Sequence, residues 1–263
     1  MLGISDSHGL QELRSPNGEY QAFVVNRELW MYSRADSQST RVFSFRQSET
    51  DEMANLQDYG IKLLSAGDDG TVDFLVSGYM SRGSHEGGVG VSLWRYEKGT
   101  NTLTERLYLP ANESSEELLM GMDTLSCLSS GGTLYLLMGN TVYSVDTASR
   151  QAQVLAEGMT EENFAVSPGQ ERIAWQDGED LYDSRSVHIM DLETGKSAQI
   201  KAPEGSSIRL LGFVGGDLVY GLAEENSSVT LSLISTIAPS YNRTSCHSRS
   251  SSYFVSVPKS CHK

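Results

Sequence analysis

Arginine, histidine and glutamate occur close together in one glycine-rich stretch, and these side chains could bind a ligand. The stretch runs from Gly78 to Gly90 and contains Arg82, His85 and Glu86. Arginine can grip a carboxylate or phosphate with its planar fork, and glycines let a backbone come close to a ligand. The stretch replaces a hairpin turn that needs only about two to five residues. It is either a binding loop or a long bulged hairpin in which Arg82 and Glu86 pair.

A second long loop is acidic and joins an equivalent pair of strands. It runs from Gln176 to Ser186 and offers Asp177, Asp180 and Asp183. A third loop, at residues 224–228, continues the trend. Loops on a rigid scaffold are where binding residues collect, so we expect all three loops to project from one face. The candidate binding residues are Arg82, His85, Glu86, Asp177, Asp180 and Asp183.

The catalytic and metal-binding sequence motifs that this chain approaches are all incomplete. Gly90-Val91-Ser92-Leu93-Trp94 lacks the last glycine of a Gly-x-Ser-x-Gly nucleophile motif. His85-Glu86 is not followed by the second histidine of a zinc motif, and the acidic clusters lack the alternating ligands of a calcium loop. We therefore expect no catalytic residue, no metal and no cofactor.

A sequence motif that occurs twice, which we call the repeated phrase, indicates the elements that would position these loops. Ser15 to Phe23 aligns without gaps to Ser167 to Trp175, about 150 residues later. Each copy places a turn before an alternating strand, and a short hairpin and a second strand follow. This order is typical of a β-propeller blade. Five such units are expected, with first turns at Asn17-Gly18, Asp69-Gly70, Gly131-Gly132, Gly169-Gln170 and Gly215-Gly216.

The fold class that follows is all-β, a β-propeller of about five recognisable blades. Helical periodicity is confined to Ser114–Met120, which predicts one or two turns between blades. The fifth unit shows no credible third and fourth strands. Because an open array would expose two sheet edges, we expect a truncated larger propeller.

Two segments resemble known propeller repeats. Ser15–Tyr32 and Ser167–Lys196 resemble the repeats of the periplasmic Tol-system protein and of the propellers beside prolyl-oligopeptidase-type hydrolases. The stretch Gly78–Gly90 resembles a segment of uncharacterised secreted or lipid-anchored propellers of clostridia. The resemblance implies a bacterial propeller but carries no activity with it.

Composition limits the partners and leaves the location open. The net charge of −14 argues against nucleic acid as a partner. No apolar run approaches the roughly 18–20 residues that span a bilayer, and no signal peptide is visible at the start. We expect an extracytoplasmic location for the full-length form. Cys127 lies in an apolar strand pattern and is expected to pack as a small hydrophobic residue.

The end of the chain differs from the rest in charge and pattern. Residues 235–263 contain no Asp or Glu and carry +4, so the preceding part carries −18. This segment is a disordered tail, a basic interaction arm or an out-of-frame translation. The expected organisation is therefore a lead-in at residues 1–14, propeller blades at 15–234 and the tail at 235–263.

Two functions fit these expectations. The first is a non-enzymatic binding or scaffold module, whose loop face contacts a protein partner or a component of the cell envelope. The second is an accessory propeller of a serine hydrolase or peptidase whose catalytic domain lies outside this chain.

Overall fold

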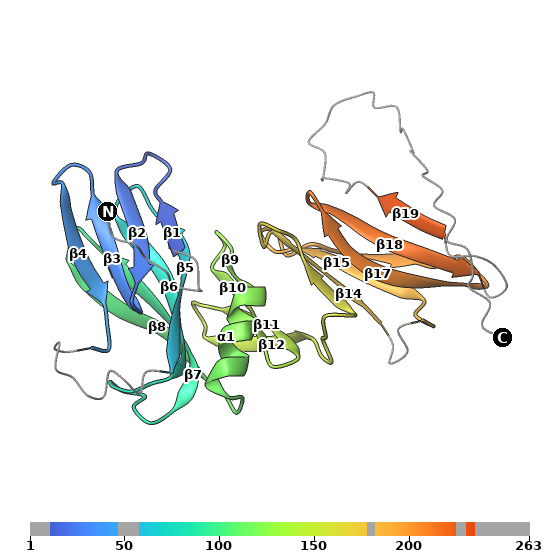
Figure 1. Ribbon diagram of the computed structural model, residues 1–263, viewed down its shortest axis with the longest axis horizontal. Coiled ribbons are helices and arrows are strands. Elements are labelled where there is room, and N and C mark those ends of the chain that lie inside the picture. The colour runs from blue at the N-terminus through green and yellow to red at the C-terminus, as the bar shows by residue number, and fades with distance from the viewer. Residues whose placement is uncertain (1–10, 47–57, 178–181, 225–229, 235–263) are drawn as a thin grey trace, which may run out of the picture. The chain divides into compact units, whose positions relative to one another are not determined.

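The protein consists of antiparallel sheets that follow one another along the sequence. The computed structural model describes residues 11–46, 58–177, 182–224 and 230–234. These residues form one helix and five sheets, each built from strands that follow one another in sequence (Figure 1). They group into two compact units, which are described separately. The first unit contains Met1–Leu128 and Gly132–Leu155, and the second contains Ser129–Gly131 and Ala156–Lys263.

The first unit holds three four-stranded sheets, A, B and C, and the helix. Sheet A consists of β1 (Gln11–Arg14), β2 (Tyr20–Val25), β3 (Glu28–Ser33) and β4 (Gln38–Phe43). Sheet B consists of β5 (Tyr59–Ala66), β6 (Thr71–Tyr79), β7 (Val89–Glu97) and β8 (Thr102–Pro110). After α1 (Ser115–Thr124), sheet C consists of β9 (Ser126–Leu128), β10 (Thr133–Met138), β11 (Thr141–Asp146) and β12 (Gln151–Ala156).

The second unit holds sheets D and E. Sheet D consists of β13 (Phe164–Val166), β14 (Arg172–Gln176), β15 (Ser186–Asp191) and β16 (Ser197–Lys201). Sheet E consists of β17 (Ser206–Val214), β18 (Asp217–Glu224) and β19 (Thr230–Ile234). The described strands pair antiparallel throughout both units, which confirms the expectation of an all-β, antiparallel protein.

The repeated phrase has the same hydrogen bonds in both copies. Backbone N–H of Tyr20 donates to Ser15 Oγ, and backbone N–H of Arg172 donates to Ser167 Oγ, each over 3.0 Å. Both serines are buried, at 3% and 5% exposure. In each copy the serine N–H also donates back to the carbonyl of that residue. The hydroxyl therefore supplies the acceptor that the first residue of the strand needs, which explains why serine stands there twice.

A second shared bond closes four of the sheets. In each of these sheets, the residue that follows the third strand donates its N–H to the carbonyl of the residue that precedes the second strand. The four pairs are Arg34 with Glu19, Lys98 with Gly70, Thr147 with Gly132, and Leu192 with Glu171. Because the same bond recurs in both units, the four sheets are copies of one structural unit.

The sequence identified the second and third strands well and missed others. The strands expected after the turns of the repeated phrase are β2 and β14. Of the strands before the first turns only β9, which contains Cys127, showed a strand pattern in the sequence, and β4 was not predicted. The fifth unit does contain a third strand, β19, contrary to expectation.

The helix lies where the sequence placed it and is longer than expected. Ser114 caps it, since its Oγ accepts from Glu117 N and Glu117 Oε2 accepts from Ser114 N, a capping box. α1 packs against β10 and β6 through its buried side chains Leu118 and Met122. The predicted one or two turns therefore extend to ten residues.

Each unit has its own apolar core. In the first unit one cluster joins sheets A and B, with Phe43, Phe74 and Trp94 in edge or tilted ring contacts. A further cluster joins sheet B, α1 and sheet C. In the second unit Ala174 and Val187 of sheet D pack with Ile208 and other residues of sheet E. Adjacent sheets thus bury their faces against one another.

Some expectations fall on residues that the structure does not describe. These are the segment 1–10, most of the loop at 224–228, Asp180 and the tail from Ser235 to Lys263. Within the described part of the chain, the helix is too short to cross a membrane.

Candidate functional site

The glycine-rich stretch forms the connection between β6 and β7 in the first unit. Met80 N donates to Gly88 O, and Gly87 N donates to Met80 O. These two backbone hydrogen bonds close the base of the loop. Gly83 and Gly87 have φ angles of 93° and 87°, which favour glycine. Arg82 and Glu86 lie in this loop, Arg82 half-buried and Glu86 exposed.

His85 is fixed by two residues of β8, the strand that follows β7. Its ring stacks on Tyr108 with 3.6 Å between centroids and 7° between planes. Its Nε2 lies 3.1 Å from Glu105 Oε2 and donates to it, because an ionised carboxylate only accepts. The side chain of His85 is 31% exposed. The loop is therefore attached to the strand through its only histidine.

Glu105 is the centre of this cluster. Besides His85, the hydroxyls of Ser84 and Ser92 donate to its carboxylate. A serine nucleophile would need its hydroxyl against a basic nitrogen. Here serine and histidine both point at the carboxylate, so this geometry fixes the loop and does not activate Ser92.

Tyr108 closes the same cluster from the side. Its hydroxyl donates to Val89 O over 3.2 Å. Burial, with a smaller contribution from the Glu105 carboxylate, raises the pKa of Tyr108. The phenol therefore stays a neutral donor across the physiological range.

The glycines of the loop bring the backbone close to the protein's own residues. A Cβ at Gly88 or Gly90 would come within 2.9 or 2.8 Å of the Tyr108 hydroxyl. At Gly78 it would meet the backbone of Asp58 and Tyr59. The need for glycine at these three positions is thus explained by packing, as the bulged-hairpin interpretation holds, without invoking a ligand.

The acidic candidates lie in the second unit, in the β14–β15 connection. Asp177 Oδ2 accepts from Ser186 Oγ at 2.7 Å and lies 2.6 Å from His188 Nε2. His188 in turn stacks on Trp175 with 5.0 Å between centroids. Burial alone would raise the pKa of Asp177, but the hydrogen bonds from Ser186 and His188 outweigh it, and that pKa is lowered.

Asp183 is exposed and pairs with Arg185 at 3.3 Å, whereas Asp180 is outside the described residues. The six candidates are therefore divided between the two units. Arg82, His85 and Glu86 belong to the first, and Asp177 and Asp183 to the second. That their loops share one face stays a prediction.

The acidic run at residues 68–73 has structural roles. Asp68 Oδ1 accepts from Asn17 N at 2.8 Å, which joins the first turns of sheets A and B. Asp69 accepts the N–H of Thr71 within its own turn. Asp73 is buried and accepts two N–H groups of Arg95, both at 2.8 Å. These oxygens serve the fold, as carboxylates in turns and buried pairs commonly do.

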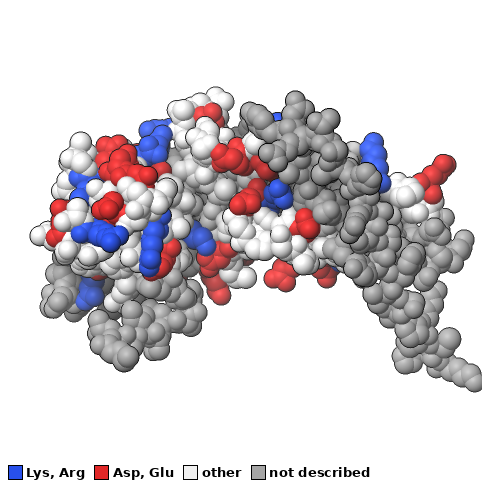
Figure 2. Space-filling view, turned by 90° about the horizontal axis from the view of Figure 1, so that it is seen from above, with Lys and Arg blue, Asp and Glu red and all other residues white. Residues whose placement is uncertain are grey.

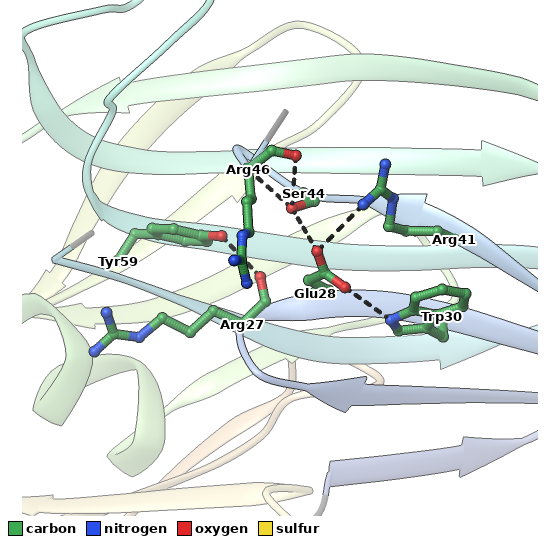
Figure 3. A network of polar contacts seen from close by, with 7 residues as sticks. All are labelled: Arg27, Glu28, Trp30, Arg41, Ser44, Arg46 and Tyr59. Carbon is green, nitrogen blue, oxygen red and sulfur yellow. Dashed lines mark hydrogen bonds and ion pairs between the residues drawn. The ribbon is translucent and has the colours of Figure 1, made fainter. Parts of the chain in front are cut away.

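A polar network at the β2–β3 turn escaped the sequence analysis. It comprises Arg27, Glu28, Trp30, Arg41, Ser44, Arg46 and Tyr59 (Figure 3). Glu28 Oε1 accepts from Arg41 at 3.4 Å and from Ser44 at 3.1 Å, and Glu28 Oε2 accepts from Trp30 Nε1 at 3.3 Å. One signal was visible in the sequence: an arginine stands in a two-residue hairpin turn where glycine is typical.

The charged side chains do not form one large patch of a single sign in the view of Figure 2. Lysine and arginine side chains lie interspersed with aspartate and glutamate over the described surface there.

Comparison with known proteins adds little beyond this geometry. No protein-family model and no curated protein matches the sequence. Two solved structures that resemble the chain are dipeptidyl peptidase 4 of Porphyromonas gingivalis, at TM-score 0.48 and 12% identity, and TolB of Acinetobacter baumannii, at TM-score 0.40 and 13% identity. The similarity covers 87% and 82% of this chain but only 38% and 51% of those chains.

Proposed function

We propose that this protein is a non-enzymatic binding or scaffold module with β-propeller architecture, and that its hairpin loops carry the binding site. The observation that supports the proposal most strongly is the loop at residues 78–90. It is much longer than its strands require, yet it is fixed by the contacts of His85 with Glu105 and Tyr108. A preformed loop loses little conformational entropy on binding.

The charged residues of this loop, the half-buried Arg82 and the exposed Glu86, suit protein recognition. Arg82 and Glu86 carry opposite charges and stand before and after the fixed His85 in the sequence. Such groups give an interface its orientation and specificity, while the rigid scaffold keeps them in place. The partner is a protein or a component of the cell envelope, and the full-length form acts outside the cytoplasm. Nucleic acid fits poorly, because the chain carries −14 and phosphate would be repelled.

The proposal is tested with the full chain immobilised and exposed to an envelope extract of the cells that encode it. Wild type is compared with the double variant Arg82→Ala/Glu86→Ala. The control is Arg150→Ala/Glu157→Ala, which removes the same two charges at exposed positions elsewhere. We expect proteins that bind wild type and the control but not the loop variant, and an affinity for the purified partner that falls about tenfold.

The thermal midpoint of each variant is measured first, so that a loss of binding is not confused with unfolding. If the loop variant and the control bind the same proteins with the same affinity, the loop is structural only and the proposal is wrong.

A second function is an accessory propeller of a serine hydrolase or peptidase. The resemblance of Ser15–Tyr32 and Ser167–Lys196 to the propellers beside such hydrolases supports it. Sequencing the DNA on both sides of the coding region separates the two. A neighbouring Gly-x-Ser-x-Gly domain in frame favours the hydrolase, and a lipid-attachment cysteine after an apolar segment favours the binding module.

A further inference from the structure

The turn between β2 and β3 holds an arginine in a costly backbone conformation. Asn26 and Arg27 have φ angles of 52° and 58°, so both central residues of the turn are left-handed, as in a type I′ turn. Asparagine tolerates this conformation, and glycine is the usual second residue. An arginine there is strained, because its Cβ comes too close to the following carbonyl oxygen. Strain of this kind is often kept where the side chain has a function.

A hydrogen bond from a buried tyrosine attaches the turn to the apolar core. Tyr59 Oη donates to the carbonyl of Arg27 over 2.7 Å (Figure 3). Tyr59 is only 1% exposed and packs in the cluster between sheets A and B. The backbone of Arg27 is therefore held by a buried side chain, while the residue itself is exposed.

Two more arginines come from the end of β4 and the residues that follow it. Arg41 contacts Glu28 Oε1, and its side chain is 48% exposed. Ser44 accepts from Arg46 N at 2.9 Å and donates to Glu28, so the backbone of Arg46 is tied to the same carboxylate. Arg27, Arg41 and Arg46, which we call the arginine tip, thus come from segments that meet near one half-buried glutamate, although the Arg27 guanidinium extends away from that carboxylate (Figure 3).

An arginine that already has a partner can still bind a second anion. A guanidinium carries five N–H donors, and an ion pair with one carboxylate uses only one or two of them. Its planar fork matches a carboxylate better than an ammonium group does. The arginine tip therefore offers several guanidinium groups, on residues held by the backbones of Arg27 and Arg46 and by the ion pair of Arg41, on a chain whose net charge is −14.

We propose that the arginine tip binds a short acidic segment of a partner protein. A short peptide contacts the tip without meeting the rest of the acidic surface, whereas a long phosphate polymer would be repelled by it. The half-buried Trp30 beside Glu28 adds an aromatic surface for an apolar residue of the peptide. This inference goes beyond the function proposed above and does not depend on the loop at residues 78–90.

The test uses the full chain and a fluorescent eight-residue peptide of alternating Glu and Leu, with a Gln-Leu peptide and a single-stranded oligonucleotide as comparisons. In the variant Arg27→Gly the guanidinium is lost while the backbone strain is relieved, so the fold is retained. We expect its affinity for the acidic peptide to fall about tenfold, the effect of one charged hydrogen-bonding group. Binding of the Gln-Leu peptide should be absent.

The chain offers a matched control in Arg150, which is also exposed and left-handed, with φ of 60°. Arg150→Gly removes the same charge and the same strain in a different turn, and we expect it to bind the acidic peptide like wild type. Equal losses in both variants would mean a net-charge effect and would overturn the proposal. So would binding of the oligonucleotide as tight as that of the peptide, or unchanged binding by Arg27→Gly. The loop variant Arg82→Ala/Glu86→Ala should keep peptide binding, which separates this result from the fate of the proposed function.

Discussion

Asp73 is a buried carboxylate of sheet B that has several hydrogen-bond donors. It is 4% exposed, pairs with Arg95 through two bonds and accepts from Ser65 Oγ at 2.9 Å. The same bonds to Asp73 raise the pKa of Arg95, so the guanidinium stays charged. Removing one partner of such a pair leaves the other without compensation.

We therefore expect Asp73→Ala to lower the free energy of unfolding by about 2–4 kcal/mol, since Arg95 can partly turn to water. Urea unfolding measures this change. The control is Asp36→Ala, which removes the exposed pair with Lys98 and should have a much smaller effect. A loss for Asp73→Ala no larger than for Asp36→Ala would show that the buried pair adds nothing to stability.

Tyr59 makes stability depend on alkaline pH. Burial raises its pKa to about 12 in the folded protein, against about 10 in an unfolded chain. Between these values the unfolded chain loses the phenolic proton first, so wild type loses stability as pH rises from about 10 to about 12. Tyr59→Phe lacks this titration but also lacks the bond to Arg27 O, which costs it about 1 kcal/mol at pH 8.

The measurable result is the difference between the two unfolding free energies as a function of pH. We expect wild type to be the more stable at pH 8 and its advantage to shrink above pH 10. A difference that stays constant up to pH 11.5 would contradict the burial of this phenol.

At the scale of the element, the repeated phrase makes a prediction about pairs. Ser15→Ala and Ser167→Ala each leave a strand N–H, of Tyr20 or Arg172, without its acceptor in a buried place. Each should lower the free energy of unfolding by about 1–2 kcal/mol. Ser39→Ala, at an exposed position of β4, should change it by less than about 0.5 kcal/mol. If only one of the two substitutions lowered the free energy of unfolding, the repeated phrase would not have the same structural role in both copies.

The loop at residues 78–90 makes a second element-scale prediction. A Cβ at Gly90 would overlap the carbonyl oxygen of Leu109 and the ring of Tyr108, so Gly90→Ala must push β7 and β8 apart. We expect a loss of about 1–3 kcal/mol. Gly99→Ala is the control, because a Cβ there meets nothing within 4 Å. Chemical denaturation compares the two, and equal stability would mean that Tyr108 moves aside freely.

The sequence predicted those elements whose signals are local. Turn residues such as Asn17-Gly18 and the short apolar runs of β2 and β10 carry their own pattern. β1 and β4 are largely polar, so their strand character comes from pairing with a neighbour. For the same reason His85 could be singled out in the loop, but Glu105 and Tyr108 could not. They lie about 20 residues away in β8, and only the register of sheet B brings them to it.

At the scale of the whole molecule, the recurrence of one structural unit leads to a statement about faces. Four sheets share the same closing hydrogen bond, and they occur in both compact units. In a propeller such units are arrayed about one axis, so that equivalent connections leave on the same side. The β6–β7 and β14–β15 connections are equivalent in this sense, and we predict that they share a face.

Spin-label distances test this prediction in a variant whose three cysteines are replaced by serine. Labels at Glu86 and Asp183 mark the two loops, and labels at Gly99 and Lys196 mark the opposite ends of sheets B and D. Strand β7 has nine residues and so separates its two ends by roughly 30 Å. If the loops share a face, the crossed pairs Glu86–Lys196 and Gly99–Asp183 should both be longer than the direct pairs Glu86–Asp183 and Gly99–Lys196. The reverse order would place the two loops on opposite faces, and the binding site would then have to be built within the first unit alone.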